Sequence, residues 1–123
     1  MTTDANATTA VTLVPGLQIT DHIVGTGDEA KSGQVVTVHY AGTLTNGKQF
    51  DASRNHSKDG FTFPLGKGRV IKGWDLGVAG MRVGGKRTLH IAPDLAYGAQ
   101  GAGSDVPPHS TLIFVVELLS VKG

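Results

Sequence analysis

The sequence contains no cysteine, which excludes disulfide bonds and any chemistry that needs a thiolate. It also has no long apolar run, because polar residues interrupt every hydrophobic segment well before the roughly 20 residues of a membrane-spanning helix. A strong basic cluster is missing as well: the densest cations are Lys86 and Arg87, and the net charge is +1. We therefore expect neither a membrane nor a nucleic-acid partner, and we expect Lys86 and Arg87 to flank a solvated turn.

The sequence also lacks the patterns of metal-dependent or nucleophilic enzymes. None of its five histidines has a His-x-x-x-His spacing, and alternation along strands predicts that His39 and His90 face outward. No Gly-x-Ser-x-Gly elbow is present, and the stretch GKG at 66–68 lacks the remainder of a phosphate-binding loop. We therefore expect no metal site and no cofactor, so an enzymatic activity would have to proceed without either.

The length and composition fit one domain with a real core, since 39% of the residues are hydrophobic and 17% are charged. Residues 1–10 have neither the basic region nor the apolar region of a signal peptide. We expect residues 1–14 to form a flexible arm before a single domain at 15–123. We also expect a cytoplasmic monomer.

Glycines are abundant, and they mark turns between short segments in which apolar and polar residues alternate. This alternation is typical of half-buried strands, and it places four residues of the last segment on one face: Leu112, Phe114, Val116 and Leu118. Asn46 and Gly47 predict a hairpin turn. Only residues 70–79 have helical spacing, with Ile71, Trp74 and Val78 on one side. These features predict an α+β domain in which an antiparallel sheet of about five strands packs around one short helix.

Six sequence strings occur together in a specific order along this chain. They are VHYAG at 38–42, GKQFDAS at 47–53, LG at 65–66, VIKGWD at 70–75, AYGA at 96–99 and VPPHSTLIF at 106–114. Each string alone is a weak signal, but the ordered set resembles the FKBP-type isomerases, the immunophilins that bind tacrolimus and rapamycin. The resemblance runs from about residue 16 to residue 121, which is nearly the whole domain.

The resemblance implies a twisted five-stranded antiparallel sheet wrapped around one short helix, with a ligand pocket between them. At matching motif positions, the pocket walls are Tyr40, Phe50, Asp51, Phe61, Val70, Ile71, Trp74, Tyr97, Val106 and Phe114. Six of the seven aromatic residues are on this list. Aromatic residues are more often plain core, and we keep that interpretation for Phe63. For Trp74, which lies between glycines on a short helix, the resemblance favours the floor of a pocket.

The resemblance also implies a function, namely cofactor-free cis-trans isomerisation of Xaa-Pro bonds in peptides and unfolded proteins, and binding of tacrolimus-class macrocycles. The residues with implied catalytic roles are Asp51, Ile71, Trp74 and Tyr97. The Ile71 backbone N–H and the Tyr97 hydroxyl donate hydrogen bonds to carbonyls, and Trp74 supports the prolyl ring. Asp51 either orients Tyr40 through a hydrogen bond or acts on the twisted carbonyl; the alternative is an ordinary loop residue at the end of a strand.

The chain departs from the family pattern at the rim of the implied pocket. Arg69 stands where family members often have an acidic residue, and residues 101–106 lack a histidine and a bulky apolar residue often found there. The segment 54–60 is one residue longer than in the shortest members. Two other functions stay open, a non-catalytic binding module and a folding chaperone. The chaperone role often accompanies a large insertion before the last strand, whereas only a short segment joins Tyr97 to Leu112 here.

Overall fold

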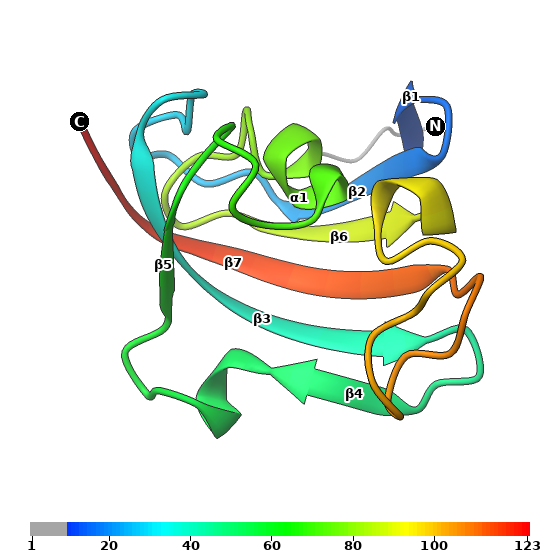
Figure 1. Ribbon diagram of the computed structural model, residues 1–123. Coiled ribbons are helices and arrows are strands. Elements are labelled where there is room, and N and C mark those ends of the chain that lie inside the picture. The colour runs from blue at the N-terminus through cyan, green and yellow to red at the C-terminus, as the bar shows by residue number, and fades with distance from the viewer. Residues whose placement is uncertain (1–9) are drawn as a thin grey trace.

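The structure is a computed structural model, and it describes residues 10–123. Within that range, seven strands form one antiparallel sheet in the order β1-β2-β6-β7-β3-β4, and β5 also pairs with β3 (Figure 1). The strands are β1 (Val11–Val14), β2 (Leu17–Ile23), β3 (Val35–Leu44), β4 (Gln49–Ala52), β5 (Phe61–Pro64), β6 (Lys86–Ile91) and β7 (Leu112–Lys122). The helices are α1 (Lys72–Gly77) and two short 3-10 turns, η1 (Ser53–Asn55) and η2 (Pro93–Leu95).

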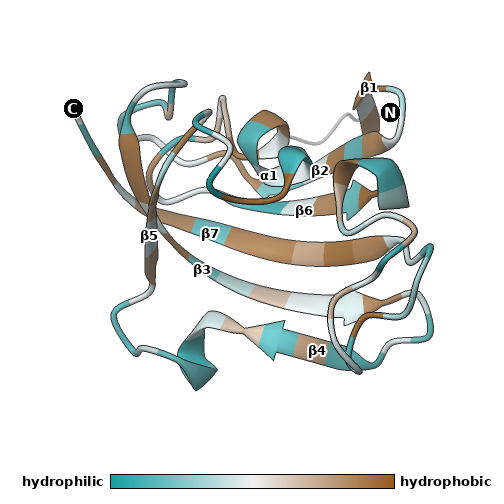
Figure 2. Ribbon diagram, viewed as in Figure 1, coloured by the Kyte–Doolittle hydropathy of each residue, from teal (hydrophilic) through white to brown (hydrophobic). Residues whose placement is uncertain are grey.

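The α+β class and the antiparallel sheet confirm the prediction, and β7 is the central strand. It pairs with β3 on one side and with β6 on the other. The face of β7 predicted to point inward, with Leu112, Phe114, Val116 and Leu118, is buried. Figure 2 shows that β7 is hydrophobic along most of its length. Because each fully buried Leu, Val or Phe side chain stabilises the fold by about 1.5–3 kcal/mol, this strand carries a large part of the core.

The sheet has more strands than the five expected, for two reasons. First, β4 and β5 share one edge of β3: β4 pairs with its second half, from Ala41, and β5 with its first half, up to Val38. Second, Val11–Val14 forms β1 and pairs with β2 as an edge hairpin. These four residues therefore belong to the sheet and not to the predicted flexible arm, while residues 1–9 of that arm lie outside the described part of the chain.

The helix α1 is shorter than the predicted stretch 70–79, and it lies against β2 and β6 (Figure 1). Ile71 precedes it with an extended backbone at ψ 149°, so the helix begins one residue later. Gly73 allows the close approach, because a Cβ atom at this position would lie 2.5 Å from the Ile91 side chain. None of the helices in residues 10–123 has the length and the apolar character needed to cross a membrane.

Arg87 is buried, so the prediction of a solvated turn flank is wrong for this residue. Its Nε and Nη2 donate to the two carboxylate oxygens of Asp21 at 2.7 and 3.2 Å. Its Nη1 donates to the carbonyls of Gly77 and Ala79, at the end of α1. Strand alternation places Arg87 on the same buried face as Leu89, and the guanidinium satisfies carbonyls that the helix end leaves free.

We predict that Arg87→Met lowers the free energy of unfolding by about 3 kcal/mol, because it removes one partner of a buried, hydrogen-bonded ion pair. Urea unfolding at pH 7, followed by the fluorescence of the single tryptophan, measures this loss. Arg54→Met is the matched control, since Arg54 is exposed and lies 3.9 Å from Glu117. We expect the free energy of unfolding of this control to fall by less than about 1 kcal/mol. Equal losses in the two variants would contradict the prediction.

Candidate active site

A pocket opens between α1 with the residues just before it, strands β3, β4, β5 and β7, and the segment after η2. Its lining residues are Tyr40, Phe50, Asp51, Phe61, Arg69, Val70, Ile71, Trp74, Tyr97 and Phe114. The cavity measures about 210 Å³. Drug-sized ligands occupy roughly 300–1,000 Å³, so this cavity suits one small ring of a larger ligand.

Nine of the ten residues expected in the walls lie together around this pocket. Val106 does not line it; this residue is buried behind the rim and lines a neighbouring hollow with Asp105 and His56. The sequence pattern did not assign Arg69 to the wall, although its position directly before Val70 was the available signal. Phe63 is buried outside the lining, which confirms that it belongs to the core.

Trp74 forms the floor of the pocket and is 4% exposed. Its ring meets Tyr40 and Phe114 edge to face, with centroid distances of 4.9 and 5.2 Å. Phe63 packs against it with a ring-centroid distance of 5.6 Å. Since each such pair adds about 0.5–1.5 kcal/mol beyond burial, the floor is rigid as well as apolar.

Two phenylalanines form the wall beside the floor, and a glycine in β3 makes room for them. Phe50 and Phe114 meet edge to face at 5.5 Å. A Cβ atom at Gly42 would lie 2.7 Å from both rings, so any side chain there would push them apart. The motif VHYAG therefore includes a residue whose missing side chain shapes the pocket.

Asp51 is an ionised carboxylate held by three donors at the pocket edge. The Tyr40 hydroxyl donates to its Oδ2 at 2.8 Å, His56 Nε2 lies 2.7 Å from Oδ1, and the Ala52 amide donates to Oδ1 at 2.9 Å. Burial alone would raise the pKa of Asp51, but the hydrogen bonds from His56 and Tyr40 outweigh it, and the pKa is lowered. The expected bond from Asp51 to Tyr40 is therefore present, and His56 is a partner that the sequence pattern did not identify.

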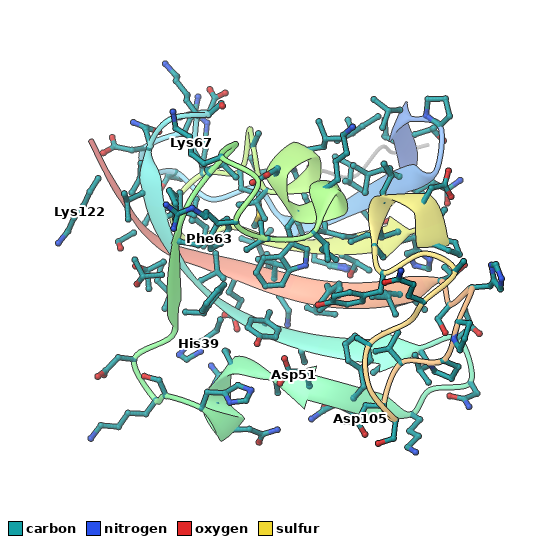
Figure 3. All side chains as sticks on the ribbon, viewed as in Figure 1. His39, Asp51, Phe63, Lys67, Asp105 and Lys122 are labelled. Carbon is teal, nitrogen blue, oxygen red and sulfur yellow. The ribbon has the colours of Figure 1, made fainter. Side chains whose placement is uncertain are left out.

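His39 supports this edge from inside the protein, so the prediction that it faces outward is wrong. It is 8% exposed; its Nδ1 lies 2.8 Å from Ser53 Oγ and its Nε2 lies 3.2 Å from the Lys58 carbonyl. Ser53 Oγ also accepts the Tyr40 amide at 2.9 Å. Residues after β4 fold back over the outer face of β3, which alternation along a single strand does not reveal (Figure 3).

The pocket lining includes donors that have no internal acceptor among residues 10–123. They include the backbone N–H of Ile71, the hydroxyl of Tyr97 and the buried indole Nε1–H of Trp74. Burial, and then the charge of Asp51, raises the pKa of Tyr97, so its hydroxyl stays protonated and able to donate. The described residues contain no group of three His, Asp or Glu side chains that could hold a metal ion. The site can therefore enclose an apolar ring and bind carbonyl oxygens beside it.

Comparisons with known proteins agree with this arrangement. A family model described as FKBP-type peptidyl-prolyl cis-trans isomerase matches residues 27–119. The chain is 53% identical over 107 residues to FK506-binding protein 1 of Dictyostelium discoideum, covering 87% of this chain and 99% of that relative. It is 56% identical over 110 residues to FK506-binding protein 4 of the same organism, covering 89% of this chain. The chain spans 23–29% of the length of the FK506-binding protein 4 relatives from Dictyostelium discoideum, Gibberella zeae and Neurospora crassa.

The fold is also similar to a solved structure, the peptidyl-prolyl cis-trans isomerase of Pseudomonas syringae pv. tomato str. DC3000. The TM-score is 0.81 at 36% sequence identity, over 93% of this chain and 81% of that one. Fold and pocket together define the class of α+β domains that enclose an apolar ring between a curved sheet and a short helix. With the family model matching most of its length, the chain belongs to the FKBP-type peptidyl-prolyl cis-trans isomerase family.

We predict that His56→Ala raises the pKa of Asp51, because it removes a hydrogen bond that favours the carboxylate. A depressed folded-state pKa stabilises the fold above the unfolded-state pKa, about 3.9, and this contribution is lost as pH falls through the folded value. The variant should therefore lose its Asp51 contribution at a higher pH than the wild type does. Carboxyl-detected NMR titration measures the shift directly.

His90→Ala is the control for this titration, since His90 is an exposed residue on β6. An unchanged Asp51 pKa in His56→Ala, equal to that in the control, would show that the contact with His56 does not hold the carboxylate.

Proposed function

We propose that this chain is a peptidyl-prolyl cis-trans isomerase that accelerates rotation about Xaa-Pro bonds in peptides and folding proteins. One observation carries the proposal: Trp74 forms the buried floor of a ring-sized cavity, and beside this cavity the Ile71 N–H and the Tyr97 O–H have no internal acceptor among the described residues. Membership of the FKBP-type family supports it further.

The reaction needs enclosure more than reactive groups. Amide resonance opposes rotation with a barrier of about 18–20 kcal/mol, and uncatalysed X-Pro bonds interchange over roughly tens to hundreds of seconds. Twisting the bond ends the resonance and reduces its charge separation, so the transition state is less polar than the planar amide. A dry aromatic cavity therefore destabilises the ground state more than the transition state.

Hydrogen bonds add to this effect by holding the substrate in one position. Neutral hydrogen bonds contribute about 0.5–1.5 kcal/mol each, so Ile71 and Tyr97 together supply at most about 3 kcal/mol, roughly a hundredfold in rate. Any further acceleration has to come from desolvation and from orientation of the prolyl ring on Trp74. The ring fits between the aromatic walls, where it displaces water from both donors.

Asp51 acts as a positioning residue in this mechanism. Its oxygens are occupied by Tyr40, His56 and a backbone amide, and no proton has to leave the substrate. The carboxylate holds the Tyr40 ring against Trp74, and its fixed charge contributes to the field at the twisted carbonyl. The residue before proline approaches past Phe50, Tyr97 and Phe114, so apolar residues are preferred there.

The same pocket is proposed to bind tacrolimus-class macrocycles, and the names of the FK506-binding relatives support this second ligand class. Affinity depends on the rim as well as on the floor. Here the rim includes Arg69, and residues 102–106 form a short hollow beside it.

We predict that Trp74→Ala lowers kcat/KM for a Leu-Pro peptide by more than about tenfold, because the prolyl ring loses its floor. Asp51→Ala should lower it several-fold through loss of the Tyr40 contact. A protease-free NMR exchange assay measures both rates, and circular dichroism checks the fold. Since Trp74 also belongs to the core, Trp74→Phe is measured beside it and should retain intermediate activity.

His90→Ala is the control and should match the wild type, since this residue lies outside the pocket. Wild-type activity in both Trp74→Ala and Asp51→Ala would show that the site is misassigned. Tight macrocycle binding by a wild-type protein without rate enhancement would instead identify a non-catalytic binding module.

We predict that Tyr97→Phe weakens tacrolimus binding about three- to tenfold, the value of one neutral hydrogen bond. Isothermal titration calorimetry on the folded variant measures the change. Tyr97→Leu, which removes the ring as well as the hydroxyl, should lose more affinity. Equal affinity of wild type and Tyr97→Phe would contradict the role of this hydroxyl as a donor.

A further inference from the structure

Arg69 gives the pocket mouth a positive charge that no described residue neutralises. It is the one cation among the ten lining residues, and its side chain is exposed. No carboxylate of residues 10–123 lies within ion-pair distance of its guanidinium. An arginine in this state is available to a ligand that carries a planar anionic group.

The segment that carries Arg69 is held in place by Asp75, the acidic residue closest to Arg69 in the sequence. Asp75 in α1 accepts the Gly66 amide at 2.8 Å and the Gly68 amide at 3.0 Å. Its two oxygens therefore fix the backbone before Arg69. The backbone that carries Arg69 is thus held at a defined place beside the cavity.

The other charge in the pocket wall is already engaged. Asp51 binds Tyr40 and His56 through its two oxygens, as described above. On the side of the mouth formed by residues 60–74, the sequence contains Lys67, Arg69 and Lys72 and no acidic residue. Lys67 and Lys72 are exposed, and the one carboxylate bound to this segment, that of Asp75, is held by the Gly66 and Gly68 amides, so cations outnumber acids on this side of the mouth.

We propose that Arg69 is a specificity-determining residue that selects Xaa-Pro segments with an Asp or Glu carboxylate next to the Xaa-Pro pair. The inference rests on the proposed isomerase function and names its substrate class. The pair forms at a wet rim, where an exposed arginine–carboxylate contact corresponds to about a two- to fivefold preference. Because it is exposed to solvent, the preference falls as ionic strength rises.

The test uses matched peptides that differ at one position. One pair carries Glu or Gln directly after proline, and a second pair carries Glu or Gln directly before the Leu-Pro unit. NMR exchange gives kcat/KM for each peptide at about 20 mM and 500 mM salt, two ionic strengths with very different screening. Wild type should prefer Glu about two- to fivefold at one of the two positions, and that position gives the chain direction across the pocket.

Substitutions then assign the preference to Arg69. For each variant, we compare kcat/KM for the Glu peptide with kcat/KM for the matched Gln peptide. A general loss of activity lowers both values and leaves their ratio unchanged. Arg69→Gln should bring the ratio to about one, and Arg69→Glu should invert it. Lys122→Gln removes the same charge from the far end of β7, away from Asp51 and the pocket, and should keep the wild-type ratio (Figure 3).

Each outcome bears on one claim. A ratio of one at both positions in the wild-type protein, with normal activity on the Gln peptides, overturns the role of Arg69 and leaves the isomerase function standing. The role of Arg69 is also overturned if the Glu/Gln ratio in Arg69→Gln stays at the wild-type value. The same holds if the ratio falls equally in Lys122→Gln. Absence of activity on every peptide would instead count against the proposed function itself.

Discussion

The contact between α1 and β6 places Trp74, the floor of the pocket, and Ile71, one of its donors. Gly73 lets the helix lie directly on Ile91, and Arg87 binds the carbonyls at the helix end to Asp21 in β2. With the helix fixed at this height, Trp74 reaches the centre of the aromatic cluster and Ile71, the residue before the helix, presents its amide to the cavity. A six-residue helix would be marginal alone, so its position depends on these tertiary contacts.

The features that could be predicted from the sequence are those that repeat with a period or match a motif. Alternation located the main strands because burial of one sheet face imposes it, and the family resemblance located nine of the ten expected pocket residues. The burial of polar side chains such as Arg87 and His39 could not be predicted in this way. Arg87 lies on a core face because a helix end needs its donors, and His39 is covered by a segment that returns from β4. Both depend on contacts between distant parts of the chain.

Polar groups in this domain are arranged so that the cavity itself stays free of competing partners. Asp51 accepts hydrogen bonds from Tyr40 and His56 at the pocket edge, and Asp75 accepts the amides of Gly66 and Gly68 in the segment before the helix. Two acids near the pocket therefore organise structure, while the Ile71 amide and the Tyr97 hydroxyl keep their hydrogen-bonding capacity for a ligand. This division explains how a pocket with charged neighbours can still present an apolar, donor-lined interior.

The floor of the pocket at Trp74 and its rim at Arg69 are therefore subject to different physical constraints. A change at the floor alters the shape of the pocket and also core packing, since Trp74 contributes to both. A change at the rim alters only solvent-exposed charge, which is worth little energy per contact and is screened by salt. A substitution at position 69 can thus change the charge at the rim without disturbing the core, whereas a substitution at Trp74 changes the pocket floor and the core together.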